Sequence, residues 1–340
     1  MANRAGCLVA ALMTATISMT AAAAAKTTLK FSFFSPTSHP WWTLGGQVFV
    51  DKVKEFTKGE VDFELYPASQ LGGDFLGLIR YGLADIVMVP AGYIAEKLPL
   101  SGVAELPGFQ DSSCDGARKL SILAKNDGVL DRYEYKPLGI KVIYVGQGSP
   151  YPILTATKPI TKIEDLAGMK LRTLGGVQGS SARALGAVPI QVAATELYDT
   201  LSRGTADGTI YGFASMKVYH LDNVLHHSLE GVTFGSSGVF VSMSEKRWNA
   251  LPDTVKDAFE KAGAIAERSL CESWDKQHAD TRDELVKAGK LTRTSLSADE
   301  LAKARAMLAP IADEWAKALD KTGRKGSEVL KAYREIGAGN

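Results

Sequence analysis

The stretch GMKLRTLGG, residues 168–176, has the pattern of a buried strand that runs into a glycine turn. Side chains alternate across a strand, so Lys170 and Arg172 share one face. A helical pattern follows at residues 178–186, and open α/β sheets bind ligands at the carboxyl ends of such strands. A helix N-terminus at this place favours an anion. Arg172 is therefore predicted either to hold a carboxylate bidentately or to form an ordinary surface salt bridge.

Strand and helix patterns alternate on both sides of this stretch, which is typical of an α/β fold. The order restarts near residues 148–152, so two similar α/β units are predicted to follow one another. The predicted strands are residues 29–34, 61–67, 85–90, 139–146, 169–173, 188–192 and 206–212, and the predicted helices between them are residues 41–59, 73–84, 178–186 and 194–204.

The last third of the chain is predicted to be helical. Residues 252–289 keep one apolar face without an internal proline, and a helix of this length would reach about 50 Å, enough to lie across both units. Capping patterns predict helix starts at Thr161 with Glu164, at Thr195, and at Ser297 with Glu300. Gly326 separates a last helix.

The first 25 residues have the composition of a secretory signal peptide: Arg4, then an apolar run, then an alanine-rich end. We expect cleavage near Ala25 and a periplasmic product. A membrane anchor is the alternative, but the run is short and diluted with alanine and threonine.

Two cysteines remain after this segment, Cys114 and Cys271. Their separation and unlike settings favour two independent residues over a structural disulfide. The five histidines have no spacing typical of a metal site, so we predict neither a metal nor a cofactor.

Composition and motifs argue against several classes of protein. The balance of 39 basic and 38 acidic side chains argues against nucleic-acid binding. The glycine-rich stretches lack the G-x-G-x-x-G pattern with a following acidic residue, which argues against a dinucleotide-dependent oxidoreductase. GSSG at residues 235–238 is not a G-x-S-x-G elbow, which argues against a secreted hydrolase. We expect a protein that is not an enzyme.

Seven segments, in order, carry a family resemblance: LKFSFFSPTSHP, YPASQLGG, GLADIVMV, LPGF, DLAGMKLRTLGG, ATELYDTLSRGTADG and WNALPDTVKDAF. Together they resemble the solute-binding proteins of tripartite ATP-independent periplasmic (TRAP) transporters, in the subgroup named after C4-dicarboxylate binding. The resemblance implies two α/β lobes that close about a hinge on a small acid, a long helix spanning both, membrane subunits as partners, and a monomer. It implies lobe I at residues 26–149 plus about 238–270, and lobe II at 150–237 plus about 271–340.

The resemblance also implies which residues bind the ligand. The family's carboxylate-clamping arginine falls on Arg172, whereas positions that often carry other polar ligands hold Pro152, Tyr211 and Phe75. His39 and Trp41 are expected beside the cleft, although each aromatic residue here would equally suit the core.

This composition of the site favours a monocarboxylate with an apolar or aromatic tail. A C4-dicarboxylate or sugar acid is the alternative, and a dicarboxylate would need a second cation such as Lys170 or Arg80. Ligand capture for a sensor, instead of a transporter, also stays open.

Overall fold

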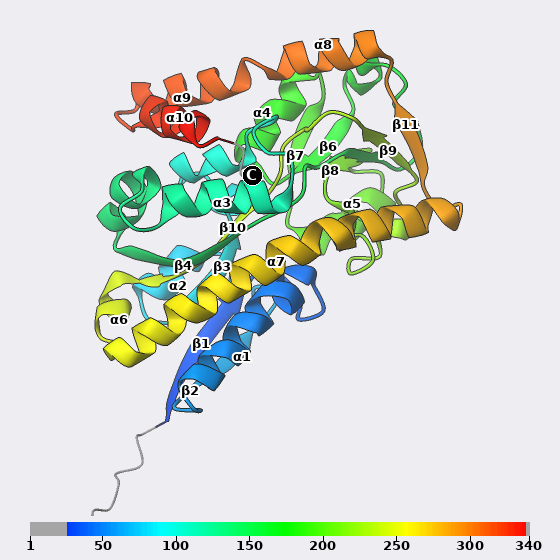
Figure 1. Cartoon of the computed structure of the whole chain (residues 1–340). Helices are drawn as coiled ribbons and strands as arrows, with labels where there is room; N and C mark the ends of the chain where they lie inside the picture. The colour runs from blue at the N-terminus through cyan, green and yellow to red at the C-terminus, as the bar shows by residue number, and fades with distance from the viewer. Residues whose placement is uncertain (1–25, 338–340) are drawn as a thin grey trace, which may run out of the picture.

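The computed structural model describes residues 26–337, which form two β-sheets with helices around them (Figure 1). The first sheet has five strands in the order β2-β1-β3-β10-β4, and the second has six in the order β11-β9-β5-β8-β6-β7. The bounds in the first sheet are β1 Thr27–Phe33, β2 Val61–Tyr66, β3 Ile86–Pro90, β4 Ile140–Gln147 and β10 Gly238–Ser244. Those in the second are β5 Ile153–Thr155, β6 Lys170–Thr173, β7 Val188–Gln191, β8 Gly208–Ile210, β9 His227–Glu230 and β11 Thr292–Ser295.

Parallel pairs form the part of each sheet where strands and helices alternate along the chain. β1 pairs in parallel with β2 and β3, and β6 pairs in parallel with β7 and β8. β10 returns to the first sheet and runs antiparallel between β3 and β4. The predicted two-lobed α/β fold is confirmed. The predicted signal peptide lies outside the described residues.

Ten α-helices are described within residues 26–337. Their bounds are α1 Gln47–Phe56, α2 Phe75–Arg80, α3 Ser113–Ala124, α4 Gly176–Ala184, α5 Leu197–Ser202, α6 Glu245–Asn249, α7 Asp253–Lys287, α8 Ala298–Leu308, α9 Ile311–Lys321 and α10 Gly326–Glu335. No helix in this described part of the chain is both long and apolar enough to cross a membrane.

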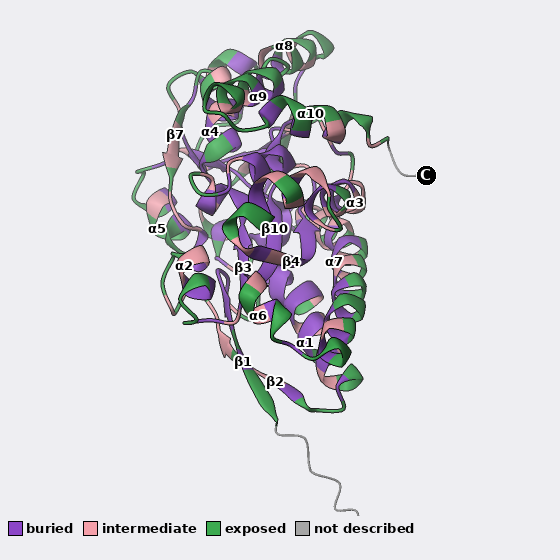
Figure 2. Ribbon diagram, turned by 90° about the vertical axis from the view of Figure 1, so that its left-hand side faces the viewer, coloured by how far each residue is buried: buried purple, intermediate pink, exposed green. Residues whose placement is uncertain are grey.

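The long helix is α7, with 35 residues. It packs against α1 and β4 of the first lobe and against the short 3-10 segment Phe213–Ser215 of the second. Figure 1 shows it running across both sheets, and Figure 2 shows that its outer side is exposed. The prediction that this helix spans both lobes is confirmed.

Three predicted helix caps have different outcomes. The Ser297 hydroxyl accepts a hydrogen bond from the Glu300 N–H at the start of α8, as predicted. The capping box of Thr161 with Glu164 is wrong, because the Asp165 carboxylate accepts from the Thr161 N–H instead. Thr195 does not cap α5, whose N-cap position is Glu196.

Cys114 and Cys271 form a disulfide that joins α3 to α7 across 157 positions of sequence. The prediction of two independent cysteines is wrong. The two residues look unrelated in sequence because only the packing of α3 on α7 brings their Cα atoms within 4.7 Å.

Two connections run side by side between the sheets. Residues 148–152 lead from β4 to β5, and residues 231–237 lead from β9 back to β10. The Gly148 N–H donates to the Ser237 carbonyl and the Tyr151 N–H to the Gly235 carbonyl, both at 2.9 Å. The paired connections suit a hinge. The C-terminal helices contact both halves, since α10 packs on α3 and α9 on α4, so the exact lobe boundaries stay a prediction.

Candidate functional site

Arg172 lies near the end of β6 and is fully buried. Its Nε donates to the Val192 carbonyl at 2.9 Å, and its Nη2 donates to the Tyr93 hydroxyl at 3.2 Å. Its Nη1 has no hydrogen-bond partner, and none of the ion pairs found within residues 26–337 includes Arg172. An ordinary surface salt bridge is therefore excluded. A buried guanidinium with a free donor is a ready partner for a bound anion.

The glycine turn beside Arg172 has the conformation that glycine permits. Gly175 and Gly176 have φ values of 97° and 48°, and α4 begins at Gly176. A Cβ on Gly175 would lie 2.6 Å from the Gln191 side chain. The turn starts α4 four residues after Arg172, and the dipole of a helix N-terminus favours negative charge.

Tyr93 joins the two lobes at this point. It lies in the short 3-10 segment Ala91–Ile94 directly after β3, in the first sheet's lobe. Its hydroxyl accepts from Arg172 Nη2 and, at 2.7 Å, from the Ala194 N–H, both in the second lobe. Sequence reasoning missed this residue. The signal that identified Arg172 would have found it, because Tyr93 also follows the carboxyl end of a buried strand.

The ring of Tyr211 lies over the Arg172 guanidinium and forms a cation–π contact with it. The Arg172 Cζ atom lies 5.3 Å from the Tyr211 ring centroid. Tyr151 adds a second ring, 6.1 Å from that of Tyr211. Burial raises the pKa of Tyr211 and the pKa of Tyr151. Both phenols therefore stay neutral, and Arg172 is surrounded by aromatic rings that carry no charge.

Glu105 is a buried carboxyl group near Arg172 that the sequence reasoning did not single out. Its Oε1 accepts from the Gly92 N–H at 2.9 Å, and its Oε2 has no partner. Burial raises its pKa to about 8, while the Gly92 N–H and the Arg172 charge oppose that rise. At neutral pH it is mostly protonated and leaves the charge of Arg172 unbalanced. Its signal in the sequence is a lone acid within the apolar run GVAELPGF.

His39 is buried among rings at the entry to a π-helical turn, Trp41–Gly46. Its ring centroid lies 5.4 Å from that of Tyr219, 6.0 Å from Phe34 and 6.4 Å from Trp274. Burial lowers the pKa of His39 to about 3, so the imidazole is neutral. The Phe34 ring also lies 6.0 Å from the ring of Tyr93, whose hydroxyl accepts a hydrogen bond from Arg172. Phe34 thus connects His39 to Tyr93.

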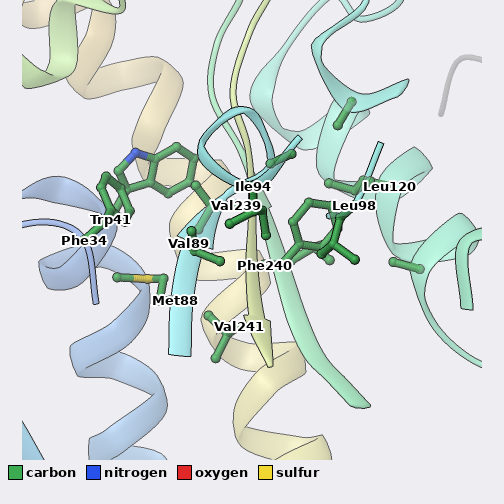
Figure 3. Close-up of a cluster of buried hydrophobic side chains, with 14 of the residues drawn as sticks. Phe34, Trp41, Met88, Val89, Ile94, Leu98, Leu120, Val239, Phe240 and Val241 are labelled. Carbon is green, nitrogen blue, oxygen red and sulfur yellow. The ribbon is translucent and has the colours of Figure 1, made fainter. Parts of the chain in front are cut away.

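The remaining predicted site residues, Trp41, Phe75 and Pro152, make no hydrogen bond or cation–π contact with the Arg172 guanidinium in the described part of the chain. Trp41 packs on Trp274, with ring centroids 4.1 Å apart and ring planes tilted by 32°, and belongs to the apolar core with Phe34 (Figure 3). Phe75 begins α2 and is buried in the same core. Pro152 accepts a backbone hydrogen bond from Tyr211 but lines a separate cavity of about 270 Å³. The structure thus links Arg172, Tyr211 and His39 through aromatic contacts, with Trp41 behind His39. Pro152 reaches this cluster only through its backbone bond to Tyr211, and Phe75 lies in the core.

The arrangement of these residues can bind a small anion. One free guanidinium nitrogen lies among neutral phenols, a neutral imidazole and apolar rings. No group of three histidine, cysteine, aspartate or glutamate side chains within residues 26–337 has the geometry of a metal site. Two α/β lobes, a paired connection and a buried cation between the lobes define a solute-binding protein.

Comparison with known families gives the same class. The model of the bacterial extracellular solute-binding protein family 7 matches residues 31–318. The chain belongs to this family, which supplies the solute-binding proteins of TRAP transporters. The family resemblance drawn from the sequence is thereby confirmed. Proteins of this family bind small carboxylates in the periplasm and work with membrane subunits.

Two characterised relatives bind different acids. The C4-dicarboxylate-binding periplasmic protein DctP of Rhodobacter capsulatus is 29% identical over 303 residues, which is 85% of each chain. The sialic acid-binding periplasmic protein SiaP of Vibrio cholerae is 27% identical over 258 residues, covering 73% of this chain and 76% of the relative.

Solved structures share the whole fold. A TRAP solute-binding protein from a marine metagenome, specific for aromatic acid ligands, superposes with a TM-score of 0.82 at 26% identity over 92% of this chain and 98% of the other. It was solved with metahydroxyphenylacetate and with 3-hydroxybenzoate. A TRAP solute-binding protein from Rhodoferax ferrireducens, with copurified benzoate, has the same TM-score at 22% identity, covering 92% and 97% of the two chains, and supports the fold alone.

Proposed function

We propose that this chain captures a small aromatic monocarboxylate in the periplasm and delivers it to the membrane subunits of a TRAP transporter. The ligand's carboxylate binds Arg172, with Tyr93, Tyr211 and His39 around its ring. One observation carries this proposal: Arg172 is a fully buried cation with a free donor, surrounded by neutral aromatic side chains. A buried charge without a partner costs several kcal/mol, and a ligand carboxylate removes that cost.

The charges of the site support one carboxylate instead of two. Within residues 26–337 the buried lysine and arginine side chains are Arg172 and Lys119, and Lys119 pairs with Asp115 at 2.7 Å. Lys170 and Arg80, which were considered as a second cation, are both exposed. The marine metagenome protein that is specific for aromatic acid ligands supports the same ligand class, because this chain shares its fold with a TM-score of 0.82 at 26% identity.

A C4-dicarboxylate is the second candidate ligand, favoured by the 29% identity to DctP over 85% of the chain. A thermal-shift panel separates the two, with succinate, malate and fumarate against benzoate, phenylacetate, mandelate and cinnamate. Ligand at about 100 times its dissociation constant stabilises a protein by roughly 2.7 kcal/mol. We expect shifts with the aromatic acids; shifts with the dicarboxylates alone would contradict the proposal.

Export, oligomeric state and lack of catalysis belong to the same proposal. We expect cleavage near Ala25, a monomer in solution, no turnover of the bound acid, and delivery to a transporter as opposed to a sensor. Mass spectrometry of periplasmic protein tests the cleavage, since an intact Met1 form in the membrane fraction would contradict it. The lobe boundaries proposed are residues 26–149 plus about 238–270 and residues 150–237 plus about 271–340.

A further inference from the structure

Three buried polar atoms without partners gather at one side of the aromatic cluster. They are His39 Nε2, the Tyr219 hydroxyl and Trp274 Nε1. The His39 ring lies 5.4 Å from that of Tyr219 and 6.4 Å from that of Trp274, centroid to centroid. The three residues come from separate elements: the loop after β1, the loop before β9, and α7. We call them the polar trio.

The hydrogen-bonding roles of the polar trio are fixed by their neighbours. His39 Nδ1 accepts from the Trp41 N–H at 3.1 Å, so the proton of the neutral ring is on Nε2. His39 Nε2 and Trp274 Nε1 are therefore donors, and the Tyr219 hydroxyl can donate or accept. Each buried donor left unpaired destabilises the ligand-free protein. Two donors and a hydroxyl without protein partners can together bind one oxygen atom of a ligand.

The trio belongs to the same site as Arg172. Burial raises the pKa of Tyr219, the neighbouring Tyr211 and Tyr93 phenols raise it further, and the charge of Arg172 opposes that rise. Phe34 contacts both His39 and Tyr93. The Tyr93 hydroxyl in turn accepts a hydrogen bond from Arg172. A chain of contacts thus runs from the guanidinium through Tyr93, Phe34 and His39 to Tyr219.

We infer that the polar trio recognises an oxygen-bearing substituent on the aromatic acid, of which a phenolic hydroxyl is the simplest, and so selects hydroxylated over unsubstituted acids. This inference rests on the proposed function, because Arg172 must hold the carboxylate. The substituent oxygen accepts from His39 Nε2 and Trp274 Nε1, and its own proton is directed to the Tyr219 oxygen. An ammonium group has no lone pair for the two donors, and a methyl group leaves all three atoms unpaired.

Titration calorimetry with matched acids tests this selection on the mature protein. The series is phenylacetate, its 3- and 4-methyl derivatives, and its 3- and 4-hydroxy derivatives. We expect one hydroxylated acid to bind at least tenfold more tightly than phenylacetate and than the methyl compound of the same position. Equal affinities for hydroxyl and methyl derivatives at both positions would overturn the inference while leaving the proposed function intact. Failure of all five acids to bind would overturn both.

Variants then locate the selection. Tyr219→Phe should weaken the hydroxylated acid about five- to twentyfold and change phenylacetate by less than threefold. Tyr144→Phe is the matched control, because Tyr144 is also buried with an unpartnered hydroxyl but packs on Phe49 in the core of the first lobe. An equal loss for both acids in Tyr219→Phe, in a variant that melts like the wild type, would contradict the assignment.

Discussion

Arg172 shows how far one residue can be interpreted from sequence. Its place near the end of a strand and before a glycine turn predicted either a carboxylate partner or an ordinary surface salt bridge, and its burial excludes the salt bridge. Phe75 shows the limit, because an apolar residue after a turn looks the same in sequence whether it lines a cleft or begins a core helix. Here Phe75 packs in the core. Glu105 and Tyr219 were missed because only tertiary packing makes their polar atoms buried and unpaired.

Glu105 is expected to make ligand binding depend on pH. Burial raises its pKa to about 8. Below that pH the carboxyl is neutral and leaves Arg172 to the ligand; as pH rises through 8 the carboxylate forms, competes for Arg172 and repels the ligand. The fraction of Glu105 that is neutral falls about tenfold between pH 7 and pH 9. The affinity for the ligand should fall by about the same factor. Calorimetry at both values, with Glu105→Gln as the control that stays neutral, measures this, and an equal loss in both proteins would rule out Glu105 as the cause.

At the scale of single elements, apolar periodicity predicted the order of strands and helices. It did not predict the hydrogen bonds that cap the helices. The capping patterns at Thr161 and Thr195 fit the sequence rule, yet Asp165 supplies the bond in one case and no side chain does in the other. The disulfide between α3 and α7 escaped prediction because its cysteines are 157 positions apart. Local pattern predicts an element, whereas its partners depend on the packing of distant segments.

The disulfide should contribute strongly to stability. It closes a long loop between Cys114 and Cys271, and loss of a native disulfide typically costs about 2–5 kcal/mol. We expect reductant to lower the melting temperature of the wild-type protein. The double variant Cys114→Ser with Cys271→Ser should melt at the lower temperature with or without reductant. A wild-type melting temperature that reductant leaves unchanged would show that the bond contributes little.

The packing of α7 on β4 depends on Gly146. A Cβ at this position would lie 2.5 Å from Leu270 Cδ2 and 2.8 Å from Trp41 Cζ3. Gly146→Ala should therefore destabilise the protein by about 1–3 kcal/mol through overpacking. Chemical denaturation measures the loss, and Gly73→Ala is the matched control because nothing lies within 4 Å of a Cβ there. Similar stability of the two variants would mean that α7 shifts without cost.

For the whole molecule, closure of the two lobes should depend on the ligand. Tyr93 joins the lobes through Arg172 and Ala194, and the paired connections at residues 148–152 and 231–237 allow a hinge. A bound acid should shift the population toward the compact form. Small-angle scattering is expected to give a smaller radius of gyration with saturating ligand, and Tyr93→Phe should need more ligand for the same change. An unchanged radius in the wild type at saturation would remove the closure claim but not the binding claim.

The central claim is that Arg172 binds the ligand's carboxylate inside the closed molecule, and calorimetric titration of Arg172→Ala with the tightest-binding aromatic acid tests it most directly. Removing one partner of a buried, hydrogen-bonded charge pair costs about 3–5 kcal/mol. The variant, folded as judged by circular dichroism, should therefore bind the acid more than about a hundredfold more weakly than the wild type. A loss below tenfold would contradict the claim and place the carboxylate elsewhere.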